Sequence, residues 1–89
     1  MTHDEIMNHF KTEFPNEVSD SMKYLEMAKA AEYMGKSELA RGLYGMAKDE
    51  YTHAKFIAGM IMKSGGTIPA DQLSKWNELE EHIFRAFRR

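Results

Sequence analysis

Two side chains with metal-binding chemistry stand where the sequence predicts a buried, apolar helix face. Within residues 37–63, positions alternately four and three apart share one face of a helix, and most of them are apolar. Glu50 and His53 interrupt this line at its middle. A buried carboxylate beside a buried imidazole is costly unless hydrogen bonds or a metal ion compensate. The line that we expect to face the core comprises Leu39, Leu43 (or Gly42), Met46, Glu50, His53, Ile57 and Met60.

The segment 16–34 carries a similar exception. Its expected inward face is apolar or small except for Glu17, and Tyr24 lies two helical turns further along the same face. The small residues on this face would allow a neighbouring helix to approach closely. The expected inward residues are Phe14, Glu17, Ser21, Tyr24, Ala28 and Ala31, with Val18 and Leu25 beside them.

The elements that must position these groups are all helical. Helix-favouring residues are abundant, and β-branched residues are few. Pro15 predicts a break or kink near Phe14, Gly35 a helix end, and Ser37 an N-cap. A Ser-Gly-Gly turn at 64–66 ends the next helix. The expected helices span about 4–14, 16–34, 37–63 and 70–89, the last with Leu73, Trp76, Leu79 (or Glu80), Ile83 and Phe87 as its apolar stripe.

Composition narrows the function classes. Eighty-nine residues predict one small domain, 1–89, of a size that often relies on association. The absence of cysteine excludes thiolate catalysis, iron–sulfur clusters and Cys₄ metal sites. A net charge of −2 does not provide the positive charge that binding to nucleic acid or anionic membranes requires. No apolar run approaches the roughly 20 residues of a membrane span. We expect a soluble, cytoplasmic protein.

The candidate ligands make only half of a known kind of site. Di-iron carboxylate bundles take one Glu from each of two helices and a Glu-x-x-His from each of the other two. This chain holds one of each: Glu17, and Glu50 with His53. A twofold homodimer would supply the rest. Two chains would then contribute four carboxylates, whose charge balances two Fe²⁺ ions. Carboxylate oxygen with one imidazole per metal suits iron, or manganese, better than zinc or copper.

The stretch 17–55 resembles the ferritin-like superfamily, and the rubrerythrin family most closely. Glu17-Val-Ser-Asp-Ser-Met-Lys-Tyr24 is similar to the first family motif, and Ala47-Lys-Asp-Glu50-Tyr-Thr-His53-Ala-Lys to its Glu-x-x-His motif. The resemblance implies that Glu50 bridges two metals and that His53 is a terminal nitrogen ligand. It also implies that Glu17 binds terminally or bidentately and that Tyr24 hydrogen-bonds a ligand carboxylate. The chain departs from the family by carrying one motif pair instead of two. In this half-length design it is similar to the encapsulated ferritins, whose iron site forms between two subunits.

These observations predict an all-α fold and a redox function. An antiparallel helical hairpin with a C-terminal helix would dimerise into a ferritin-like four-helix bundle with two irons per dimer. The expected chemistry is oxidation of Fe(II) with O₂ or reduction of H₂O₂, the latter with an external electron donor because the chain lacks cysteine. Two alternatives stay open: a metal-free homodimeric interaction module, and a metal site with a sensing or storage-accessory role.

Other polar residues have simpler interpretations. We expect the remaining histidines, His3, His9 and His82, to be solvated, and the methionines to fill the core. Glu13, Asp20 and Asp49 flank the candidate ligands. They fit a solvated helix face better than an acidic route for incoming metal.

Overall fold

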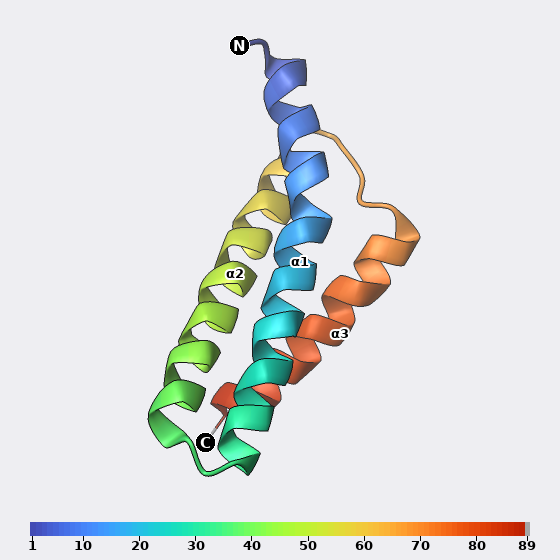
Figure 1. The fold of residues 1–89 in the computed structure, drawn as a ribbon. Helices are drawn as coiled ribbons and strands as arrows, with labels where there is room; N and C mark the ends of the chain where they lie inside the picture. Colours follow the sequence, from blue (N-terminus) through green and yellow to red (C-terminus); the bar gives the residue numbers. More distant parts are fainter. Residues whose placement is uncertain (89) are drawn as a thin grey trace.

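The computed structural model describes residues 1–88 and confirms an all-α fold. In this range the helices are α1 (His3–Tyr33), α2 (Ser37–Lys63) and α3 (Ala70–Phe87) (Figure 1). α3 ends before the predicted limit of 89, a position that lies outside the described residues. None of the described helices has the length and apolar character needed to cross a bilayer.

α1 and α2 form the long antiparallel hairpin that the sequence predicts. Figure 1 shows them side by side along their lengths, joined by a tight turn, while α3 runs back along the hairpin and ends near that turn. The contact between the rings of Tyr44 on α2 and Phe87 on α3, 6.0 Å apart, fixes the end of α3 there.

Both long helices end in the same glycine-dependent turn. Gly35 and Gly65 have φ angles of 76° and 82°, in the left-handed region that favours glycine. The Lys36 amide donates to the Ala31 carbonyl, and the Gly66 amide donates to the Ile61 carbonyl, each at 2.9 Å. These bonds satisfy carbonyls that a helix end would leave unpaired. They also turn the chain sharply enough for α2 to return along α1.

The start of α2 differs from the prediction. Ser37, expected as the N-cap, is the first helical residue, and Lys36 occupies the N-cap position without a side-chain hydrogen bond. The tight turn explains the difference, because the chain enters α2 directly from the hydrogen-bonded end of α1. By contrast, the start of α1 has a complete capping box between Thr2 and Glu5.

The sequence predicts a break or kink near Phe14, and the break is wrong. α1 continues through Pro15, so the segments expected at 4–14 and 16–34 form one helix of 31 residues. Proline removes only one helical donor, the amide that would bond the Lys11 carbonyl. Phe14 and Val18 on either side are both buried against the other helices. Packing on both sides of the proline therefore outweighs the local loss.

The core lies where the three helices meet. Trp76 of α3 stacks on Tyr51 of α2 with ring centroids 5.1 Å apart, and Phe14 of α1 packs against the same indole at 5.7 Å. The Tyr51 hydroxyl donates to Glu80 Oε2 at 2.9 Å. Burial, and then this bond, raise the pKa of Tyr51 to about 12, which keeps the phenol protonated as a donor. These contacts attach α3 to one side of the hairpin.

The predicted inward face is right for α1 and partly wrong for α2. On α2, Leu43 and Ile57 are buried, but Leu39, Met46 and His53 are exposed. The reason is that α1 and α3 both pack on α2 and shift its buried arc by about one residue. The buried residues of α2 are Ala40, Leu43, Ala47, Tyr51, Ala54, Ile57, Ala58 and Ile61.

Replacing Pro15 tests the continuity of α1. In a continuous helix, Pro15→Ala restores a hydrogen bond and removes a steric conflict, so the free energy of unfolding should rise, by up to about 3 kcal/mol. Urea denaturation measures the change, and Asn16→Ala at the exposed neighbouring position is the control. A Pro15→Ala variant no more stable than the parent would indicate that the helix ends at this point in solution.

Candidate metal centre

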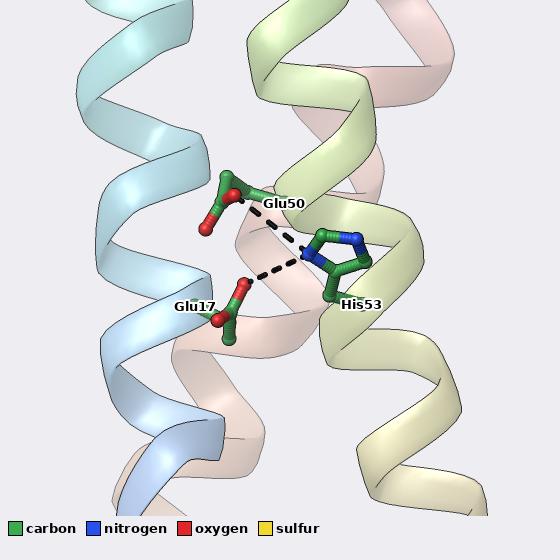
Figure 2. A group of neighbouring side chains, drawn as sticks. All are labelled: Glu17, Glu50 and His53. Atoms are coloured by element: carbon green, nitrogen blue, oxygen red, sulfur yellow. Dashed lines mark ion pairs between the residues drawn. The ribbon is translucent and has the colours of Figure 1, made fainter.

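The hairpin brings Glu17, Glu50 and His53 together. Glu17 projects from α1, and the other two project from adjacent positions on one face of α2 (Figure 2). His53 Nδ1 lies 3.5 Å from Glu17 Oε2 and 3.7 Å from Glu50 Oε1. One oxygen or nitrogen from each of the three residues falls within 4.8 Å of the others. Two carboxylates from two helices thus converge on one imidazole.

The three groups lie in a half-open position instead of deep in the core. The side chains of Glu17 and Glu50 are 19% and 23% exposed, but that of His53 is 60% exposed. The expected burial of His53 is therefore wrong for the single chain. In Figure 2 the imidazole lies beside the two carboxylates between α1 and α2, and α3 passes behind the group, so the three side chains lie on the side of the hairpin that faces away from α3. We call this side of the hairpin the open face; helical periodicity places Met27, Leu39 and Met46 on it with the three candidate ligands, and Phe56 lies beside His53 at the adjoining pocket.

Glu17 has a buried oxygen that lacks a hydrogen-bond donor. Within residues 1–88, Glu17 Oε2 is the only buried side-chain oxygen or nitrogen without a hydrogen-bond partner. The nearby His53 Nδ1, at 3.5 Å, is within ion-pair range but does not make a hydrogen bond. A carboxylate oxygen removed from water without a donor is costly, and a bound cation would relieve that cost.

Glu17 perturbs the carboxyl group of Glu50. Hydrogen bonding to the Glu17 carboxyl group is the largest cause that raises the pKa of Glu50 from 4.5 to about 7, followed by burial and by the charge of Glu17. The charge of His53 acts in the opposite direction, and Asp20 adds a smaller upward effect. Near neutral pH the Glu50 carboxyl group of the metal-free protein is therefore partly protonated. A divalent cation can take the place of that proton.

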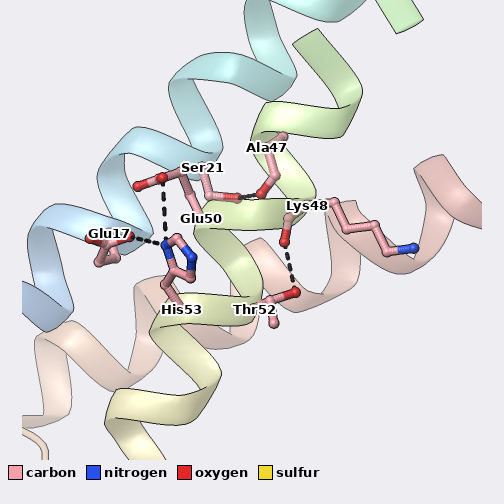
Figure 3. Close-up of polar contacts among 7 residues, drawn as sticks. All are labelled: Glu17, Ser21, Ala47, Lys48, Glu50, Thr52 and His53. Carbon is pink, nitrogen blue, oxygen red and sulfur yellow. Dashed lines mark hydrogen bonds and ion pairs between the residues drawn. The ribbon is translucent and has the colours of Figure 1, made fainter. Parts of the chain in front are cut away.

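A bond that the sequence did not reveal holds the helices together beside this group. The Ser21 hydroxyl donates to the Ala47 carbonyl across the α1–α2 interface (Figure 3). From the sequence, Ser21 was expected only as a small residue that permits close packing. A buried serine in an otherwise apolar helix face was the available signal.

Tyr24 lies between the two parts of the core. Its side chain is half-buried and packs against both apolar clusters of the hairpin. In the described part of the chain no hydrogen bond links its hydroxyl to Glu17 or Glu50. Its predicted bond to a ligand carboxylate therefore stays a prediction for the metal-bound state.

Solvent reaches the group through an adjoining pocket. The pocket has a volume of about 500 Å³, and Phe10 of α1 and Phe56 of α2 are among the residues that line it. The pocket lining is His9, Phe10, Glu13, Glu17, Thr52, His53, Phe56 and Ile57.

The histidines near the N-terminus are exposed, as the sequence predicts. This holds for both His3 and His9, and the His3 imidazole lies 3.7 Å from the Asp4 carboxylate.

The residues present fit a transition-metal ion. Opposite ligands of such an ion at 2.0–2.2 Å lie roughly 4 Å apart, close to the spacing of this group. The donor set of two carboxylates and one imidazole favours iron or manganese. The donor-free oxygen of Glu17 is the atom that most requires a cation.

The comparison with known proteins agrees with these residues. The family model described as rubrerythrin matches residues 9–86. The match spans both Glu17–Tyr24 and Glu50–His53, and it confirms the resemblance drawn from these motifs. No curated protein and no solved structure matches the chain significantly.

The stability of the metal-free protein should depend on pH through Glu50. Because the pKa of Glu50 is about 7 in the folded chain and about 4.5 for an unperturbed glutamate, the native state binds an extra proton between these values. This stabilising contribution is full below pH 4.5 and is lost as pH rises through 7. Thermal unfolding in the presence of a chelator should therefore show a melting temperature that falls from pH 5 to pH 8.

Glu50→Gln provides the control for this prediction. It removes the titrating group while keeping its shape, so the fall between pH 5 and pH 8 should flatten. A parent protein whose stability rises over the same interval would contradict the proposed closeness of the two carboxyl groups.

Proposed function

The chain belongs to the rubrerythrin family, and from this premise we propose that it binds iron through Glu17, Glu50 and His53 as a non-haem di-iron carboxylate protein. The donor-free, buried oxygen of Glu17 beside Glu50 and His53 is the observation that carries this proposal. With both carboxyl groups ionised, this oxygen has no protein donor, whereas a metal ion between the three groups would satisfy it and neutralise the carboxylate pair.

We further propose that a second copy of the chain completes the site. One chain provides two carboxylates and one imidazole, which is half of the ligand set of a di-iron bundle. The group lies on the open face, so a twofold partner could place its own Glu17, Glu50 and His53 opposite. The exposed imidazole, which a single chain leaves in solvent, would then become enclosed.

The open face has the composition of an interface. Met27, Leu39 and Met46 are 46%, 53% and 44% exposed near the α1–α2 turn, and Phe56 is 62% exposed towards the other end. Such apolar residues on both sides of a polar centre suit burial against an identical surface, with the polar groups meeting at the middle. On α2, Leu39, Met46 and His53 recur every seven residues, the spacing of a helix seam in a bundle.

The chemistry of the proposed site follows from its ligands. When bound, a pair of irons supplies the electrons for reaction with O₂ or H₂O₂. Glu17 and Glu50 would hold the ions and can change their mode of attachment as charge changes, while His53 fixes one nitrogen ligand per chain. The adjoining pocket gives small molecules access to the carboxylates. The chain has no cysteine to hold a second iron centre, so repeated peroxide reduction would draw electrons from an external donor.

Metal analysis tests the site. Protein purified without oxygen should bind about one iron per chain, and Glu50→Ala or His53→Ala should abolish binding because each removes a ligand. His3→Ala and Glu26→Ala, at exposed positions of the same residue types, are controls that should keep the parent ratio. Iron binding by both ligand variants at the parent level would refute the site. Consumption of O₂ or H₂O₂ by the Fe²⁺-loaded protein then separates the two reactions.

The solution mass tests the partner. The parent should form a dimer, and Met46→Asp should dissociate it and reduce the iron content because a charge would be buried in the seam. Met62→Asp is a matched control: it is 60% exposed and lies about 160° around α2 from Met46. Light scattering that shows a monomer for the parent at full iron loading would contradict the shared site.

A further inference from the structure

We propose that Ser21 is a positioning residue of the metal centre, which ties α1 to α2 beside the ligands and sets the separation of Glu17 from Glu50. The effect of Ser21 on metal binding rests on the proposed function, whereas the position of Ser21 between the helices follows from the fold alone. Ser21 does not contact the candidate ligands through any hydrogen bond seen in residues 1–88, so it would act only through the spacing of the helices.

The bond itself is short and fully buried. Ser21 Oγ donates to the Ala47 carbonyl oxygen at 2.6 Å, and neither residue is exposed to solvent. Ser21 is the only buried polar residue among the described positions. A serine side chain reaches only a short distance, so this bond requires the backbones of α1 and α2 to lie close together here.

The bond lies in register with the ligands (Figure 3). Ser21 follows Glu17 by four residues, and Ala47 precedes Glu50 by three. The backbone position of each is therefore about one helical turn, roughly 5 Å, from that of the glutamate on its own helix. Any change in the distance between the helices at Ser21, or in their axial register, would therefore change the distance between the two carboxylates.

Local alternatives to this bond exist and are used elsewhere in the chain. A hydroxyl inside a helix can donate to the carbonyl four residues earlier. Thr12 donates in this way to Asn8, and Thr52 to Lys48, at 3.0 and 2.9 Å. Ser21 instead donates to the other helix. The Ala47 carbonyl can already accept the helical amide of Tyr51, so the serine is not needed to satisfy it. Its specific effect is to join the two helices.

Widening the interface at this point tests the role, with Co²⁺ as the metal probe. Ser21→Val removes the donor and adds bulk, so it should weaken Co²⁺ binding about tenfold, or about 1.4 kcal/mol, and change the visible absorption of bound Co²⁺. Ser21→Ala removes the bond without added bulk and should weaken binding by roughly three- to fivefold.

Ala28→Val is the matched control. Ala28 is also fully buried on the inward face of α1, two turns further from the ligands. The Ala28→Val variant should have a melting temperature lowered about as much as that of Ser21→Val, but its Co²⁺ affinity and Co²⁺ absorption should equal those of the parent. Equal losses of affinity in both valine variants, or no loss in either, would show that Ser21 contributes to stability alone.

A metal-free measurement keeps this inference separate from the proposed function. A double-mutant cycle of Glu17→Gln and Glu50→Gln, followed by urea unfolding at pH 8, measures the coupling of the two carboxylates. The coupling should persist with Ala28→Val and fall towards zero with Ser21→Val. If the parent binds no Co²⁺, the metal proposal fails and this cycle alone decides the role of Ser21. An unchanged coupling in Ser21→Val overturns the positioning role.

Discussion

The mutual repulsion of two carboxylates held on neighbouring helices is the constraint on which the rest of this structure depends. Glu17 and Glu50 are brought together by the antiparallel hairpin, because each projects from one of its two helices into the same group. A proton, an imidazole or a cation must reduce the repulsion. The protein supplies His53 from α2 for part of this task, but it leaves one buried oxygen of Glu17 without a donor. This arrangement supports the proposal that the hairpin holds a cation.

The hairpin keeps its two sides chemically distinct. On the side of α3, an aromatic core is formed by Phe14, Tyr51 and Trp76. Among the residues described, the only hydrogen bond made by these three side chains runs from the Tyr51 hydroxyl to Glu80. On the open face, carboxylates and an imidazole lie between exposed apolar residues. Since Glu50 and Tyr51 are adjacent, α2 contributes consecutive side chains to the two environments. α3 stabilises the hairpin without covering the ligands, and the open face stays available for a partner.

This arrangement explains how so short a chain could support di-iron chemistry. Longer bundles of this kind carry both ligand pairs in one chain, whereas this one would obtain the second pair by symmetry. The same symmetry would place the exposed apolar residues of the open face against the corresponding residues of the partner. Assembly of the ligands and burial of Met46 and its neighbours would then occur together. Iron binding and association should then be linked, each favouring the other.

The sequence by itself determined the all-α fold, the hairpin and the identity of the metal-binding candidates. Helix periodicity and the two glycine turns define the long helices, and Glu17, Glu50 and His53 are recognisable because charged groups interrupt apolar lines. The sequence around Pro15 wrongly predicted a helix break, because tertiary packing on both sides of the proline maintains the helix. Local signals also could not show which edge of the apolar arc on α2 would be covered.

Only the tertiary structure decided these last points. Burial depends on where α3 packs, and α3 covers the side of Tyr51, so that Leu39, Met46 and His53 remain exposed in the single chain. The bond from Ser21 to Ala47 joins residues 26 positions apart, and no local pattern specifies the partner of a buried hydroxyl. Periodicity records which residues share a face of one helix, whereas the distance between groups on two helices is set by the side chains that pack between them.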